Sequence, residues 1–531
     1  MSRQHEKMDQ VLGRWDVLAV AFGAMIGFGW IVLTGEFLDR AGTLGAALAF
    51  VAGGLVVAFV AFTYAELVAA LPHVGGEHSY VLRSMGSRAS FFCSWTLVLG
   101  YVSVVAFEAV ALPQTLLYIF PDMLVGKMYS VAGYDVYTSW VAVGVVAAVV
   151  MTWLNVVGAR PAAVFQTVAV LFLAAVGVVL VAGAFVGGDV ANMEPLFDGG
   201  WGGFLSVLVA TPFLFVGFDV IPQSAEEISL PYKKIGEALI VSVLLAISWY
   251  VMIMLTTSSS MHAVDLAHSE LAVADAVTKM FGHPAWGTLL VLGGVAGILT
   301  SWNGFLIGAS RLVYALARSG MLPEWFGRLH PRYRTPANAV VFIGATSVLA
   351  PFFGRKTLVW LVDAGGLSIV VAWIMVALAF IILRRREPEM ERPFRTPGGV
   401  VTGGIAIALA SGVAVLFMPG MPAALTGPEW AIVAVWSVFG IPLLLRIPHV
   451  TGGPDAEHRL IEATHPAWGE KGVHEPPAPI TRFHEEHDAA LHEEAMQRMD
   501  DDGGPVAPDE GHRRHRSRRP RRDRPRSERS S

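Results

Sequence analysis

The feature that most constrains this chain is a series of long apolar stretches between residues 15 and 446. Each stretch runs for roughly 18 to 30 residues, and short polar loops separate the stretches. A helix of about 20 apolar residues is long enough to cross the ~30 Å hydrocarbon core of a bilayer. The pattern therefore predicts an all-α protein that crosses a membrane many times.

The distribution of charge supports this interpretation. The first 446 residues contain 50 charged side chains and the last 85 contain 31, so an apolar body precedes a polar tail. The whole chain is 15% charged, against ~25% for an ordinary soluble domain, which argues against a soluble enzyme or a nucleic-acid binder. A single cysteine, Cys93, excludes an internal disulfide and a multi-cysteine metal site. We therefore expect no metal and no cofactor.

The apolar runs predict about twelve transmembrane helices within residues 15–446. Residues 1–14 are polar and lack a cleavage site, so the first span is not a removable signal peptide. The twelve ranges are 15–34, 44–71, 91–120, 139–157, 163–187, 203–222, 236–257, 285–316, 337–353, 358–383, 400–418 and 429–446.

Basic residues predict the orientation of these spans. An even number of spans places both termini on one side, and that side carries 18 Lys and Arg in its segments and loops, against five on the other. Because basic loops stay in the cytoplasm, we expect a multi-pass plasma-membrane protein with both termini cytoplasmic.

The tail from 447 to 531 is polar and lacks apolar clusters, which predicts disorder. Its last part carries ten arginines between Arg513 and Arg529. That part either contacts anionic lipid headgroups or is simply a solvated terminus. The histidines of the tail lack the fixed spacing of a metal site.

Two of the predicted helices contain interruptions. The first has glycines at 23, 27 and 29, and the sixth has Pro212 and Gly217, with Pro222 just after. Glycine weakens a helix, and backbone groups freed inside a membrane must line a cavity or find partners. Small residues for close helix packing are the alternative explanation. Paired interruptions in corresponding helices of two halves favour a substrate site at the bilayer midplane.

Several motifs resemble those of the amino acid, polyamine and organocation permeases. They read G-A-M-I-G-F-G at 23–29, Y-A-E-L at 64–67, P-H-V-G-G-E-H-S-Y at 72–80, F-V-G-F-D at 215–219 with E-E at 226–227, and S-R-L at 310–312 with G-M-L-P at 320–323. The resemblance implies a LeuT-type fold with two inverted five-helix repeats, at about 15–187 and 203–383, and two further helices at 400–446. It also implies secondary active transport of amino acids or related small amines by alternating access.

An amino acid offers a carboxylate and an ammonium, and interrupted helices supply complements to both. Freed N–H groups near Gly27 and Phe28 suit the carboxylate, and freed carbonyls near Gly23 and Phe215 suit the ammonium. Phe28 departs from the family, where a small hydroxyl residue is usual, so a side-chain contact is lost. We expect the substrate site to include Gly23, Ala24, Ile26, Gly27, Phe28, Gly29, Glu108, Phe213, Phe215 and Gly217.

Two residues of the sixth span have alternative interpretations. Phe213 lies four residues before Gly217, where the family often has an aromatic that closes over the substrate, but it is equally a packing residue. Asp219 is ionisable within an apolar span, which favours a functional role. It is either a coupling carboxylate that binds and releases a proton or the partner of a cytoplasmic lysine.

Glu108 is the most isolated charge of the third span. It is a counter-ion for a cationic substrate, a proton carrier, or a protonated carboxyl bonded to the backbone. Cationic carriers of the family have a glutamate where this chain has Gly100, which weakens the first alternative. The lysine that proton-coupled relatives carry on the fifth helix is absent from 165–173, which rules out proton coupling through that residue. Proton coupling by Asp219 or Glu108, sodium coupling and substrate exchange stay open.

Glu66, Glu226 and Arg311 lie near the cytoplasmic ends of spans, where we expect gating ion pairs or helix caps. The leading interpretation is a transporter whose partners are a small-molecule amino acid or amine, a coupling ion and the lipid bilayer. The alternatives are an exchanger of polyamines or other metabolites and, from another class, a transport-silent sensor that acts through its tail. The spans contain no catalytic motif, so an enzyme is the least supported class.

Overall fold

The computed structural model describes residues 8, 10–269, 271–421 and 423–464, and these residues are mainly helical. The α-helices are α1 (Arg14–Met25), α2 (Gly29–Val32), α3 (Thr34–Ala70), α4 (Glu77–Met85), α5 (Ser87–Leu116), α6 (Thr138–Val157), α7 (Ala159–Gly187), α8 (Gly200–Phe215), α9 (Val220–Gln223), α10 (Tyr232–Ser258), α11 (Ala263–Ala267), α12 (Ala272–Phe281), α13 (Pro284–Arg318), α14 (Ala337–Leu349), α15 (Thr357–Arg386), α16 (Val400–Leu416), α17 (Gly427–Arg446) and α18 (Ala456–Thr464). The strands β1 (Lys127–Val131) and β2 (Tyr134–Tyr137) form an antiparallel hairpin.

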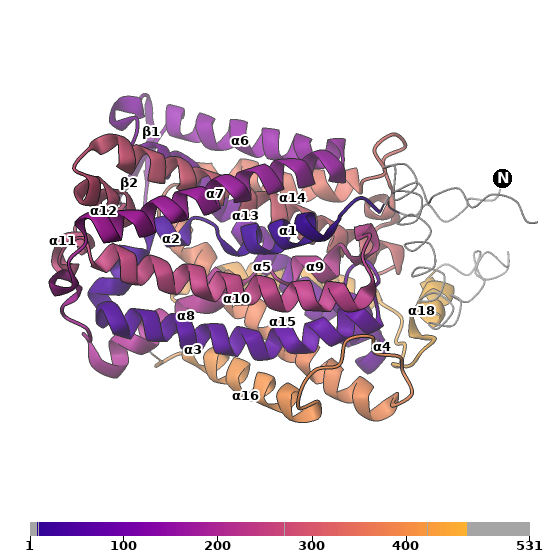
Figure 1. Cartoon of the computed structure of the whole chain (residues 1–531). Helices are drawn as coiled ribbons and strands as arrows, with labels where there is room; N and C mark the ends of the chain where they lie inside the picture. Colours follow the sequence, from indigo (N-terminus) through magenta and orange to yellow (C-terminus); the bar gives the residue numbers. More distant parts are fainter. Residues whose placement is uncertain (1–7, 9, 270, 422, 465–531) are drawn as a thin grey trace, which may run out of the picture. The chain divides into compact units, whose positions relative to one another are not determined.

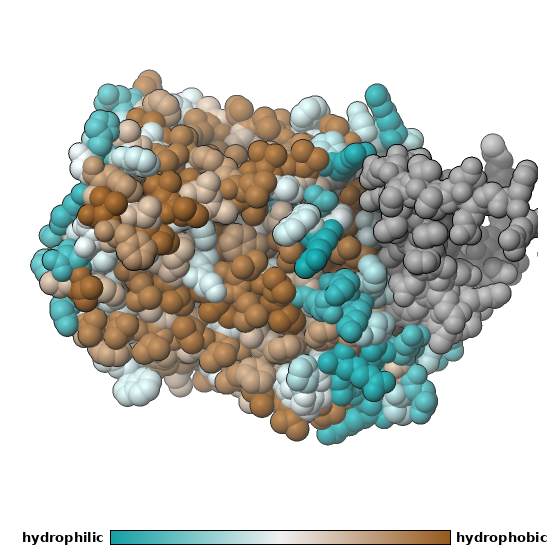
Figure 2. Space-filling view, in the orientation of Figure 1, coloured by the Kyte–Doolittle hydropathy of each residue, from teal (hydrophilic) through white to brown (hydrophobic). Residues whose placement is uncertain are grey.

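The prediction of a polytopic helical membrane protein is confirmed. In the described part of the chain, nine helical segments are long and apolar enough to cross a membrane, and two shorter apolar helices accompany them. The face in Figure 2 carries a broad apolar belt bordered by polar residues. Figure 1 places α4 and α18 at one end of the helical bundle and α11, α12 and the hairpin at the other. All twelve predicted ranges overlap helices, while their arrangement as inverted repeats stays a prediction.

The first predicted span is divided. α1 ends at Met25, Ile26 leaves the helical conformation, and α2 begins at Gly29. α3 is interrupted at Gly42, which has a non-helical conformation with φ of 71°, so two helical segments meet there and the second begins close to the predicted residue 44. The segment from Thr34 to Ala41 instead continues the first predicted span beyond its expected end at residue 34.

The sixth predicted span is divided as well. α8 ends at Phe215, Val216 is extended, and Gly217 has φ of 132°, a conformation that side chains other than glycine rarely adopt. The short helix α9 follows after Asp219. Both interruptions therefore lie where the glycines predicted them.

Small residues bring α13 against α1. A Cβ atom on Gly304 would lie 2.7 Å from the Cβ of Ala24, and one on Gly297 would lie 2.8 Å from the carbonyl oxygen of Ile26. Helices in a membrane pack closely through such positions, because no side chain separates the backbones. α1 also packs against α7 and α10, so its interrupted end is enclosed on several sides.

The prediction of disorder from residue 447 onward is wrong for residues 447–464, and residues 465–531 lie outside the described part. Residues 448–464, here called the C-terminal strap, include α18 and contact the loop and helices around α4. The Val450 carbonyl accepts a hydrogen bond from the Ser87 N–H at 2.9 Å, and the Gly453 N–H donates to the Arg83 carbonyl at 2.7 Å. The strap is ordered because Leu460 is fully buried on the apolar side of α18.

Candidate functional site

The two interruptions meet in the interior. A Cβ atom on Gly217 would lie 2.8 Å from the Met25 nitrogen and 2.9 Å from the Ala24 carbonyl carbon. Gly217 therefore lies directly against the end of α1, although 190 residues of sequence separate it from Gly27. The two breaks therefore lie against each other.

Tyr250 of α10 connects the two breaks. Its hydroxyl lies 2.9 Å from the carbonyl oxygen of Met25 and 3.3 Å from that of Leu214, which are carbonyls near the ends of α1 and α8. The last carbonyls of an interrupted helix lack helical partners, so a buried hydroxyl stabilises both ends at once. Nothing in the apolar run 236–257 distinguishes Tyr250, so sequence reasoning did not select it.

Glu108 of α5 reaches the first break and is buried, with 1% of its surface exposed. A Cβ atom on Gly27 would lie 2.5 Å from Glu108 Oε1 and 2.9 Å from Ser301 Oγ of α13. The Ser301 side chain and the Phe28 main-chain N–H are the hydrogen-bonding groups beside the carboxyl. Glu108 therefore lies at the amide that we expected to hold a substrate carboxylate.

An aromatic row lines this position. Phe28 packs edge to face on Phe107, with ring centroids 5.4 Å apart, and Phe107 packs on Phe213 at 5.6 Å. Phe215 belongs to a different cluster, since its ring contacts Phe50 and Tyr250. Phe28 and Phe213 therefore both pack on Phe107, the residue that precedes Glu108, while the Phe215 side chain packs elsewhere and leaves only its backbone near the break.

The other residues predicted on the first interrupted helix are enclosed. Ile26 and Ala24 are at most 2% exposed, and Gly29 packs against the Leu214 side chain. Gly27 retains partial exposure between these buried neighbours. The accessible surface of the break therefore centres on Gly27.

An uncharged amide network occupies the region where related proton-coupled carriers have a lysine. Gln166 of α7 donates to the Ala19 carbonyl of α1 at 3.2 Å and lies against Gly23. Asn303 donates to Gln166 Oε1 at 2.8 Å, and Asn155 donates to Asn303 Oδ1 at 2.8 Å. All three amides are buried, so they tie α1 to α6, α7 and α13 without an ionisable group.

Asp219 lies in the second break, fully buried. Its Oδ1 accepts a hydrogen bond from the Gly217 N–H at 2.9 Å, so the side chain caps an amide freed by its own interruption. No lysine pairs with Asp219 among the residues that the structure describes, which removes the alternative of a cytoplasmic lysine partner there.

Glu66 forms a charged cluster at the end of α3. It pairs with Arg384 at 2.5 Å and with Arg392 at 3.0 Å, and it accepts the Thr396 N–H at 2.8 Å. The cluster joins α3 to the end of α15 and to the segment that follows α15.

Arg311 of α13 pairs with Glu227 at 2.9 Å, and both side chains are almost completely buried. Glu226 has a different partner, since its Oε1 accepts the Val74 N–H at 3.1 Å. The predicted pairing region is therefore present, with Glu227 rather than Glu226 as the partner of Arg311. Burying such a pair costs desolvation free energy. Replacing one partner by a neutral residue would leave the other charge buried and unpaired, which is strongly destabilising.

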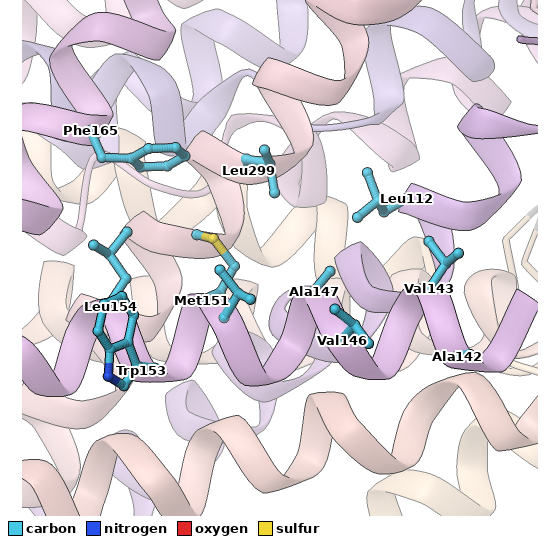
Figure 3. Close-up of a pocket in the computed structure, with 11 residues that line it drawn as sticks. Leu112, Ala142, Val143, Val146, Ala147, Met151, Trp153, Leu154, Phe165 and Leu299 are labelled. Atoms are coloured by element: carbon cyan, nitrogen blue, oxygen red, sulfur yellow. The ribbon is translucent and has the colours of Figure 1, made fainter.

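A separate apolar groove of about 690 Å³ lies along α6 (Figure 3). Its lining includes Met151 and Trp153 of α6, Phe165 of α7 and Leu299 of α13. Trp153 is 63% exposed, so the groove opens onto the outer face of α6. It offers no partners for a carboxylate or an ammonium, and the site at the breaks is the better candidate for an amino acid.

Comparison with known proteins identifies the family. Residues 12–441 match the family model described as amino acid permease. The branched-chain amino acid permease BcaP of Bacillus subtilis is 28% identical over 414 residues, which cover 76% of this chain and 87% of the permease. The methylthioribose transporter of Bacillus subtilis is 27% identical, over 82% of this chain and 92% of that protein. Cationic amino acid transporter 7 of Arabidopsis thaliana is also 27% identical, over 85% of this chain and 79% of that protein.

Proposed function

This chain belongs to the amino acid permease family, and from that membership we propose a secondary transporter that carries an apolar amino acid across the plasma membrane. Residues 15–187 and 203–383 are its two inverted repeats, and both termini are cytoplasmic. The observation that carries the proposal is the meeting of two interrupted helices around Gly27, with a buried carboxyl from α5 beside it.

The breaks suit the two charged groups that every amino acid shares. The N–H of Phe28 and its neighbours complements the carboxylate, and the carbonyls near Met25 and Leu214 complement the ammonium. Backbone groups serve this purpose inside a bilayer because they bind charge without carrying net charge themselves. Since most of the surrounding residues are buried, the substrate enters and leaves only when helices move, as alternating access requires.

The lining of the site supports an apolar substrate side chain. Phe28, Phe107 and Phe213 offer ring faces and edges, which favour contact with apolar groups. Glu108 lies at the backbone end, beside Gly27 and the Phe28 amide, rather than among those rings. We therefore infer that Glu108 contacts the carboxylate end of the substrate and does not pair with a cationic side chain.

Glu108 and a substrate carboxylate would repel each other at the same amide if both were ionised. In this proposal Glu108 carries a proton when substrate is bound and donates a hydrogen bond to the substrate carboxylate. Ser301 orients the carboxyl from the opposite side.

Uptake into proteoliposomes tests the proposal. The purified chain is assayed with labelled leucine, lysine, putrescine and methylthioribose, with and without imposed proton and sodium gradients. We expect saturable leucine uptake that unlabelled apolar amino acids inhibit. Uptake of methylthioribose alone would indicate a metabolite carrier, and uptake of no compound by a folded protein would favour the sensor interpretation.

A further inference from the structure

A second buried polar cluster lies beyond Asp219, where the first turn of α4 contacts α9. Glu77, the first residue of α4, is fully buried, and its Oε2 accepts a hydrogen bond from the Gln223 side chain. The Gly75 N–H donates to the Gln223 carbonyl at 3.3 Å. Gly76, with φ of 30°, packs so closely that a Cβ atom would lie 2.7 Å from Pro222 Cβ. The start of α4 thus packs closely on Pro222 and Gln223 of α9, while the rest of α4 packs on α5 and α15.

Asp219 is the second carboxyl of this cluster. Its Oδ1 is held by Gly217, while Tyr101 and Trp373 face the carboxyl. The charges of Glu77 and Asp219 act on each other, and both act on the Tyr64 hydroxyl. One carboxyl belongs to the break and the other to α4, so the cluster spans the contact between these elements.

Several buried polar atoms of the cluster make no hydrogen bond of normal geometry, namely Glu77 Oε1, Asp219 Oδ2, Gln223 Oε1 and the Tyr64 and Tyr101 hydroxyls. Donor side chains nevertheless lie beside both carboxyls, Tyr64 at Glu77 and Tyr101 with Trp373 at Asp219. Within residues 10–464, apart from 270 and 422, no ion pair joins a basic side chain to either carboxyl. A buried site with two carboxyls, and with three acceptor oxygens that lack a hydrogen bond of normal geometry, favours a bound positive charge.

We propose that Glu77, Asp219 and Gln223 form a site for one monovalent cation, a proton or a sodium ion, whose occupancy holds α4 against α9. This inference rests on the proposed transport function only for its role in coupling. With the cation bound, the pair of carboxyls carries one negative charge instead of two, and the two groups stay together. When the cation leaves, two carboxylates in low dielectric repel each other, and separation of α4 from α9 relieves the repulsion.

Few groups around Glu77, apart from the carboxyls themselves, change their charge as the pH rises from low to neutral values. The titratable side chains that interact with Glu77 are Asp219, Tyr64, Tyr80, Cys93 and Tyr101, and phenols and thiols ordinarily carry their protons at neutral pH. Burial, and then the neighbouring Asp219, raise the pKa of Glu77 well above its ordinary value. A raised pKa means that Glu77 keeps its proton to a higher pH than an ordinary carboxyl does and loses it as pH rises further.

The single cysteine of the chain reports on docking. Cys93 of α5 is fully buried, and the charge of Glu77 acts on it. Maleimide labelling of Cys93 is measured against pH in the purified full-length protein, with and without sodium. We compare wild type with Glu77→Gln and with the control Glu237→Gln, whose exposed carboxyl pairs with Lys234 at 2.7 Å. Removing the charge of Glu77 would by itself make the thiol more reactive, so slower labelling of Glu77→Gln reports that α4 opens less.

We expect wild type and Glu237→Gln to label about tenfold faster than Glu77→Gln at high pH, the ratio that one pKa unit of repulsion produces, and all three to label alike at low pH. Sodium that restores slow labelling at high pH identifies sodium as the cation, and no effect of sodium identifies the proton. Infrared spectroscopy of the neutral carboxyl band, which Asp219→Asn and Glu77→Gln should each diminish, checks the site without any transport assay. Identical labelling of wild type and Glu77→Gln at every pH, with an unchanged infrared band, would overturn the proposal. Failure of leucine uptake alone would instead overturn the proposed function.

Discussion

The two breaks are alike in backbone but differ in what satisfies them. The first, at 26–28, faces side chains from other helices, with Glu108 of α5 and Ser301 of α13 beside Gly27. The second, at 216–219, is capped by its own residues, since Asp219 accepts the Gly217 N–H. The first break is therefore suited to exchange its partners for those of a substrate. The second is suited to transmit a local change of charge to the neighbouring helix α9.

Gly27→Leu should have the largest effect, because it blocks the break that we assign to substrate recognition. Its Cβ would meet Glu108 Oε1 and Ser301 Oγ at contact distances below 3 Å, so the side chain occupies the recognition position. We expect leucine binding to fall below detection in an equilibrium binding assay on purified protein. The matched control is Gly412→Leu on α16, where a Cβ atom meets no other atom within 4 Å. Normal binding by Gly27→Leu would place recognition at the second break.

Glu108→Gln tests whether the first break recognises the substrate backbone. Because Glu108 lies at the Phe28 amide, the change should weaken leucine and any cationic amino acid to a similar degree, by about 1.5–3 kcal/mol, the range for a hydrogen bond to a charged group. Competition binding with leucine and lysine measures both. A loss of about 2–5 kcal/mol for lysine alone would instead make Glu108 a side-chain counter-ion.

Tyr250→Phe should loosen the link between the breaks. The change removes the hydroxyl shared by the Met25 and Leu214 carbonyls and costs about 1–3 kcal/mol, because these acceptors become unsatisfied. We expect lower thermal stability together with slower leucine exchange. Tyr134→Phe in the exposed hairpin is the control and should change neither quantity. If leucine exchange were unaffected while thermal stability fell, the role of the Tyr250 hydroxyl would be purely structural.

Phe213→Leu should give the smallest effect and separates the two aromatic clusters. Phe213 belongs to the row beside Glu108, so we expect leucine affinity to fall by less than about 1.5 kcal/mol with little change in melting temperature. Phe215→Leu, in the cluster with Phe50, should lower the melting temperature and spare affinity. The opposite pattern would move the side-chain pocket to the Phe215 cluster.

The sequence predicted the spans and the breaks well because glycine and proline are conspicuous in apolar helices. It did not select Tyr250 or Ser301, since an apolar background does not indicate which face of a helix points inward. Glu77 was part of a motif that supported only the family resemblance, and its burial depends on how α4 docks on α9. The Gln166 network was missed for a related reason, because the absence of a lysine does not reveal which neutral groups replace it.

The C-terminal strap has a consequence for the order in which the protein is made. Synthesis proceeds from the N-terminus, so Arg83 and Ser87 emerge from the ribosome hundreds of residues before their partners Gly453 and Val450. The loop around α4 therefore acquires its final contacts only after the last helix of the bundle has been translated. A ribosome that stops at residue 446 would release a chain with every predicted span and an unfinished surface at α4, which quality-control proteases could recognise.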